Sequence, residues 1–163
     1  MLFRSQPAPE GRLLLGVLWL IHWLPLGAQA AFGRGLGALL YRLAGSRRRI
    51  ALRNLELCLP EKSTAEREAL AREHFGWLGR SIVERGLLWW ASRERLMKLI
   101  HVEGEVDLAE RSERPVMWLV PHFMALDVAG ASVLLFQKRK GASIYQQQSN
   151  PVMDAVIRQG RLR

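Results

Sequence analysis

The feature that most constrains the fold is an uncharged apolar run over residues 13–28, which reads LLLGVLWLIHWLPLGA. A helix needs about 20 apolar residues to cross a bilayer, so this run has a marginal length for a full span. Trp19 and Trp23 are four residues apart and share one helix face, where tryptophan anchors at the level of lipid headgroups. The run predicts a membrane-associated helix, spanning or interfacial. The alternatives are a helix buried in a core and a cleavable signal peptide.

The positive charge is concentrated beside this run. The chain has a net charge of +9, and residues 1–55 carry eight arginines against one acid. A second apolar segment over residues 30–44 leads directly into Arg47, Arg48 and Arg49. Arginines that follow an apolar segment mark the cytoplasmic side of a membrane, which argues against a secreted protein. We therefore predict a membrane anchor with a basic flank over residues 1–46.

The middle of the chain has a helical pattern. Residues 47–58 predict one helix, and the lone cysteine, Cys58, at its end is expected to be buried; one cysteine excludes a disulfide scaffold. Ser63 and Glu66 have the spacing of a capping box, so a long amphipathic helix is expected over residues 64–91. Its glycines allow close packing against a neighbour: Gly76, Gly79 and Gly86.

From residue 99 onward the pattern changes to short apolar runs of strand length. Strands are predicted over residues 99–102, 116–120 and 142–145, and helices over residues 127–136 and 151–159. Strands that alternate with helices are typical of an α/β fold with parallel strands. The expected architecture is a helical segment that leads into such a sheet.

His122 and Asp127 are the candidate catalytic residues, because they follow the run of residues 116–120 directly. Ligands of α/β proteins bind at the carboxyl ends of strands, and histidine titrates near neutral pH, as a general base requires. Two side chains five residues apart do not share a helix face. They can meet if His122 lies in the turn before the helix and Asp127 in its first turn. The alternative is a histidine with a structural role; a metal site is disfavoured because further ligands are lacking.

These motifs together resemble the lysophospholipid acyltransferase superfamily, and within it the bacterial lipid A biosynthesis lauroyl/myristoyl acyltransferases. Four pieces in order carry the resemblance: the N-terminal apolar segment followed by arginines; Arg53-Asn54-Leu55 through Cys58-Leu59-Pro60-Glu61 with Ser63 and Glu66-Arg67; His122-x4-Asp127; and Asn150-Pro151 followed by Gly160-Arg161-Leu162-Arg163. The second piece is the most specific to the lipid A subfamily.

The resemblance implies a cofactor-free and metal-free acyl transfer from an acyl-acyl carrier protein to a hydroxyl of a lipid A precursor of the Kdo2-lipid IVA type. His122 would be the general base and Asp127 would orient it. Arg161 and Arg163 would bind a phosphate of the lipid or of the donor. The expected location is the bacterial inner membrane, with the catalytic part on the cytoplasmic face.

Family members are longer than this chain, so residues 47–163 are expected to be the N-terminal part of an acyltransferase α/β domain. Two other functions stay open: a glycerophospholipid-type acyltransferase with the same His-x4-Asp chemistry, and a non-catalytic membrane-bound fragment. A nucleic-acid partner is not expected, because the sequence carries no recognition motif for one.

Overall fold

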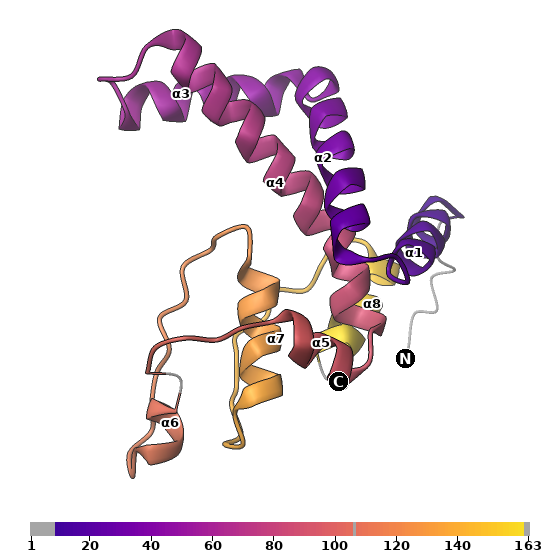
Figure 1. Cartoon of the computed structure of the whole chain (residues 1–163), viewed down its shortest axis with the longest axis vertical. Helices are drawn as coiled ribbons and strands as arrows, with labels where there is room; N and C mark the ends of the chain where they lie inside the picture. The colour runs from indigo at the N-terminus through magenta and orange to yellow at the C-terminus, as the bar shows by residue number, and fades with distance from the viewer. Residues whose placement is uncertain (1–8, 106, 162–163) are drawn as a thin grey trace. The chain divides into compact units, whose positions relative to one another are not determined.

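The structure, a computed structural model, describes residues 9–105 and 107–161. Its helices are α1 (Pro9–Ile21), α2 (Leu26–Leu43), α3 (Gly45–Cys58), α4 (Thr64–Trp90), α5 (Arg93–Leu99), α6 (Leu108–Arg111), α7 (Leu126–Phe136) and α8 (Pro151–Arg161) (Figure 1). The chain divides into two compact units. One is formed by Leu24–Glu84, and the other by the residues up to Trp23 together with those from Arg85 onward.

The apolar run of residues 13–28 is divided between two helices rather than forming one. Helix α1 ends at Ile21 and α2 begins at Leu26, with Pro25 at the N-cap of α2 at φ −56° and ψ 148°. Proline has no amide hydrogen to continue a preceding helix, which explains the break. No helix in the described ranges is long and apolar enough to cross a membrane. The prediction of a membrane-spanning helix at the N-terminus is therefore wrong for the described residues.

The prediction of an α/β fold with parallel strands is also wrong. Among the described residues no segment forms a strand, and the structure is helical. Residues 116–120 and 142–145 lie in irregular segments, where Met117 is 95% and Leu119 96% exposed. A strand is stable only when a neighbour pairs its backbone N–H and C=O groups. The described part of the chain supplies no such neighbour, so the apolar runs do not become strands.

Four of the helices, by contrast, lie where the sequence predicted them. The predictions for residues 47–58, 64–91, 127–136 and 151–159 are confirmed by α3, α4, α7 and α8. The capping box is confirmed as well. The Ser63 amide donates to Glu66 Oε2 at 2.8 Å, and the Glu66 amide donates to Ser63 Oγ at 3.3 Å. Cys58 is exposed, so its predicted burial is wrong.

In the unit formed by Leu24–Glu84, α2 and α4 pack at backbone distance, and Figure 1 shows them side by side. A Cβ atom placed on Gly79 would lie 2.1 Å from the carbonyl oxygen of Gly33 and 2.5 Å from the amide nitrogen of Gly37. Alanine would not fit at this crossing, because real Cβ atoms do not come so close to backbone atoms. The prediction that glycine allows close packing holds for Gly79, whereas Gly76 has open space around it.

The core of this unit lies beside the glycine crossing. Tyr41, Ala71 and Phe75 are buried together, and the two rings meet edge to face with centroids 5.4 Å apart. The Tyr41 hydroxyl donates to Glu68 Oε1 at 3.2 Å, and the Arg72 guanidinium lies 4.5 Å from the centre of the tyrosine ring. Burial, and then the Glu68 carboxylate, raise the pKa of Tyr41 above its ordinary value.

In the other unit, the C-terminal end of α4 packs against α1 and α8. A Cβ on Gly86 would lie 2.5 Å from the carbonyl oxygen of Leu18, and one on Gly160 would lie 2.3 Å from the Trp89 ring. These close approaches hold the end of α4 between the other two helices. The residues of α4 from Arg85 to Trp90 therefore form a firmly packed segment within this unit.

Candidate functional site

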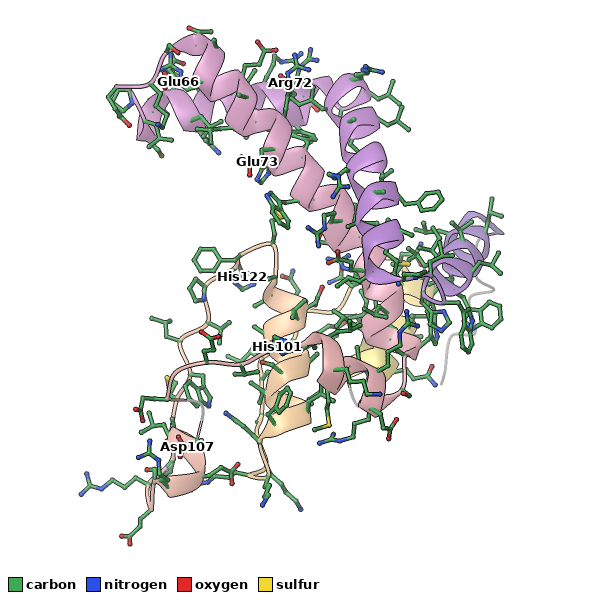
Figure 2. The ribbon with its side chains drawn as sticks, in the orientation of Figure 1. Glu66, Arg72, Glu73, His101, Asp107 and His122 are labelled. Atoms are coloured by element: carbon green, nitrogen blue, oxygen red, sulfur yellow. The ribbon has the colours of Figure 1, made fainter. Side chains whose placement is uncertain are left out.

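The loop before α7 carries His122. The Phe123 amide donates to the Pro121 carbonyl at 2.9 Å, and the Leu126 amide donates to the Phe123 carbonyl at 3.1 Å, so the loop turns tightly into the helix. Figure 2 shows His122 on this loop, and its side chain is exposed. An exposed imidazole at the start of a helix is accessible to a substrate from solvent.

Asp127 lies in the first turn of α7. A carboxylate is favoured there, because the N-terminal end of a helix carries a partial positive charge. Asp127 Oδ2 accepts a hydrogen bond at 3.0 Å from the Nε–H of Arg85, which belongs to α4. The side chains of Arg85 and Asp127 are 37% and 28% exposed. The ion pair thus ties the first turn of α7 to the packed end of α4, inside one compact unit.

The sequence analysis required His122 in the turn before the helix and Asp127 in its first turn if the two side chains are to meet. The structure has His122 in the loop before α7 and Asp127 in the first turn, but among the described residues no hydrogen bond joins the two side chains. The ion pair that fixes Asp127 comes from Arg85. The catalytic roles of His122 and Asp127 stay predictions.

A hollow with a volume of about 120 Å³ lies beside the ion pair. It is lined by Arg85, Trp89, Asp127, Gln148 and Ile157. A water molecule occupies about 30 Å³ in the liquid, so the hollow holds a few waters or a small polar group and is too small for a long acyl chain. The lining combines one charged pair with a glutamine, an indole and an aliphatic side chain.

The segment that carries Gln148 is itself fixed to α8. The Gln148 amide donates to Asp154 Oδ1 at 2.8 Å, and the Tyr145 hydroxyl donates to the same oxygen. These two hydrogen bonds, the tyrosine's first, lower the pKa of the buried Asp154 carboxyl. Asn150 Oδ1 caps the helix by accepting from the amide of Val152 at 3.0 Å. One wall of the hollow is therefore held in place by local hydrogen bonds.

The predicted phosphate-binding arginines lie at or beyond the edge of the described residues. Arg161 is the last residue of α8, but its side chain lies outside the described residues, as does the whole of Arg163. Their roles stay predictions. In residues 9–105 and 107–161, no cluster of three or more His, Cys, Asp or Glu side chains could hold a metal ion.

Sequence reasoning missed Arg85. Its partner Asp127 is 42 residues away, and no local pattern links two positions at that distance. One signal was present: Arg85 directly precedes the small and apolar stretch from Gly86 to Trp90. A charged side chain at the edge of a packed segment needs a partner or solvent.

Comparison with known proteins shows the class of enzyme to which the chain is related: the acyltransferases. The sequence model for the bacterial lipid A biosynthesis acyltransferases matches residues 10–163, so the chain belongs to this family. The resemblance drawn from the sequence motifs is thereby confirmed.

Characterised relatives agree with this assignment. The chain is 37% identical over 151 residues to the lipid A biosynthesis palmitoleoyltransferase of Escherichia coli (strain K12). The matched residues are 91% of this chain and 49% of the relative. The lauroyltransferase of the same organism is 33% identical over 151 residues, with the same coverage, 91% and 49%. Its myristoyltransferase is 37% identical over 123 residues, 74% of this chain and 38% of the relative. The chain thus spans about half the length of these relatives. No solved structure matches it.

Proposed function

We propose that the protein transfers an acyl chain from an acyl-acyl carrier protein to a hydroxyl of a lipid A precursor of the Kdo2-lipid IVA type. Membership of the family supports acyl transfer, and the relatives' roles in lipid A biosynthesis support a lipid A precursor as the acceptor. The observation that carries the site assignment is the position of an exposed His122 in the turn immediately ahead of Asp127.

In this mechanism His122 accepts the proton of the acceptor hydroxyl. The hydroxyl oxygen attacks the thioester carbonyl carbon, so that a C–O bond forms. The C–S bond then breaks, and the imidazolium returns its proton to the departing thiolate of the carrier protein. The products are an ester on the lipid and a free carrier thiol. No protein nucleophile is needed, because the substrate hydroxyl fills that role.

Asp127 would accept the other ring N–H of His122, which fixes the imidazole tautomer and stabilises the imidazolium. Its ion pair with Arg85 leaves room for this, because a carboxylate has about four lone-pair sites. Arg161 and Arg163 would bind a phosphate through their planar guanidinium groups. Loss of either arginine is expected to raise the KM for the lipid acceptor.

We further propose that the protein works at the cytoplasmic face of the bacterial inner membrane. The eight arginines of residues 1–55 support contact with anionic lipid, which attracts basic residues by about 1 kcal/mol each. Flotation with vesicles of anionic phospholipid tests this proposal. Binding at low salt, weaker with vesicles of neutral lipid, is expected; equal flotation with both kinds of vesicle, or none with either, would contradict it.

The test of function is a transfer assay in detergent, with the protein expressed from its natural reading frame. Acyl-acyl carrier protein is the donor, and Kdo2-lipid IVA, glycerol 3-phosphate and a lysophospholipid are compared as acceptors. His122→Ala is expected to abolish transfer to Kdo2-lipid IVA, and Asp127→Asn to lower kcat by about 10³- to 10⁴-fold, as loss of the orienting acid does in a catalytic triad.

Each outcome bears on the proposal. Transfer to Kdo2-lipid IVA that depends on His122 supports it. Transfer to the glycerol-based acceptors alone would replace it by a glycerophospholipid acyltransferase. Absence of transfer to every acceptor would favour a non-catalytic protein, and full activity of His122→Ala would overturn the proposed base.

A further inference from the structure

We propose that Arg85 is a positioning residue, which holds Asp127 in the orientation that supports His122. This inference rests on the proposed function, because it assigns a role within the same site. The juxtaposition that carries it is the ion pair between α4 and the first turn of α7, beside the hollow of about 120 Å³.

The contact has the geometry of a specific bond rather than a loose surface pair. Arg85 donates its Nε–H to Asp127 Oδ2 at 3.0 Å, and both side chains are more than half covered by protein. Most other ion pairs of the described chain join residues three to six positions apart and stabilise one helix or turn locally. This pair connects two helices, so it sets where the carboxylate of Asp127 stands.

Arg85 can do this because its own helix is fixed. Gly86, the next residue, lies against the backbone of Leu18, and Trp89, one turn later, lies against Gly160. The loop of His122 has no comparable support: its residues 121–125 are all exposed. A base on an exposed loop gains its orientation from the groups it contacts, and in the proposed mechanism that group is Asp127. The chain of support then runs from α4 through Arg85 to Asp127 and finally to His122.

The guanidinium group suits this role better than an ammonium. Its donors lie in one rigid plane, so a bond from Nε fixes the direction of the carboxylate as well as its distance. A lysine at this position would keep the charge but would act as a mobile point charge. Without any partner, the half-buried carboxylate of Asp127 would turn toward solvent and away from the imidazole.

The experiment is a double-mutant cycle on transfer from acyl-acyl carrier protein to Kdo2-lipid IVA, with the protein from its natural reading frame. The variants are Arg85→Gln, Arg85→Lys, Asp127→Asn and the double variant Arg85→Gln/Asp127→Asn. The matched control is Arg80→Gln, which breaks another partly buried ion pair of α4, between Arg80 and Glu84 at 2.8 Å. Thermal unfolding of every variant reports on stability alone.

Arg85→Gln is expected to lower kcat by about 10- to 100-fold with less than a threefold change in KM, the size of effect that a displacement of about 1 Å has in an active site. Arg85→Lys is expected to recover only part of this loss. In the Asp127→Asn background the same Arg85→Gln change is expected to alter kcat by less than about twofold, because the carboxylate through which Arg85 acts has already been removed. Arg80→Gln is expected to keep wild-type kcat.

The proposal is overturned if Arg85→Gln keeps wild-type kcat, or if Arg80→Gln lowers kcat as much as Arg85→Gln does. It is also overturned if Arg85→Gln lowers kcat by the same factor in the Asp127→Asn background as in the wild type. His122→Ala, measured beside these variants, distinguishes a failure of the positioning role from a failure of the proposed function. If His122→Ala is inactive while Arg85→Gln is fully active, the positioning role fails and the proposed function stands. If His122→Ala is active, or the wild type transfers nothing, the proposed function fails and the role of Arg85 fails with it.

Discussion

Replacing Gly79 by alanine is expected to destabilise the crossing of α2 and α4, whereas the same replacement at Gly76 is expected to stabilise the protein. Both residues lie in the interior of the same helix, three positions apart, so the gain in helix propensity on replacing glycine by alanine is the same for both. They differ in what a new methyl group meets. At Gly79 it would lie 2.1 Å from a carbonyl oxygen of α2, and at Gly76 it meets nothing within 4 Å.

The magnitude follows from that geometry. A carbon and a carbonyl oxygen approach to about 3.3 Å, so the two helices would have to move apart by about 1 Å to admit the methyl group. Such overpacking lowers the free energy of unfolding by about 1–3 kcal/mol, and the better helix propensity of alanine offsets up to about 1 kcal/mol of this loss. Gly79→Ala is thus expected to lose about 1–2 kcal/mol of unfolding free energy, and Gly76→Ala to gain about 0.5–1 kcal/mol.

Urea unfolding followed by far-UV circular dichroism measures the difference. The expected order of midpoints is Gly76→Ala, then wild type, then Gly79→Ala, with unchanged m-values. Equal midpoints for the two variants would refute the argument, because the backbone contact would then contribute nothing to stability.

Three further outcomes are expected. Ser63→Ala removes half of the capping box that Ser63 forms with Glu66 and is expected to cost about 1 kcal/mol in the same unfolding assay. The lowered pKa of Asp154 means that its ionised form stabilises the fold at neutral pH; Asp154→Asn is therefore expected to be less stable than wild type at pH 7, with the gap closing as the pH falls below the ordinary aspartate value of 3.8. The chain has two tyrosines, so in Tyr145→Phe the phenolate absorbance reports Tyr41 alone and is expected to titrate with a midpoint above 10.0 while the fold persists.

The helices could be predicted because their signals are local. The capping box of Ser63 and Glu66 fixes the start of α4 within four residues of sequence, and the apolar spacing that follows needs no knowledge of the rest of the chain. Pro25 was an equally local signal, but the prediction of a single helix over residues 13–28 did not take it into account. The proline divides that predicted helix into α1 and α2. The predicted boundary between residues 46 and 47 stays a prediction.

The strands failed because their stability is not local. Residues 116–120 have the apolar composition of a buried strand, but composition does not supply the partner whose backbone groups complete the ladder. Without a paired neighbour, Met117 and Leu119 are almost fully exposed. The same reasoning applies to Asp127, since the spacing from His122 located the turn and could not reveal a partner on α4.

The candidate site divides its two requirements between two kinds of structure. A general base must be reached by the acceptor hydroxyl and by the thioester, so it belongs on an accessible segment, and His122 lies on an exposed loop. An accessible loop does not by itself hold an imidazole in one orientation. Asp127 lies in the first turn of α7, and its ion pair with Arg85 connects α7 to the end of α4, which packs against α1 and α8. In the proposed mechanism, orientation would therefore come from the packed helices through the carboxylate of Asp127, and access would come from the loop.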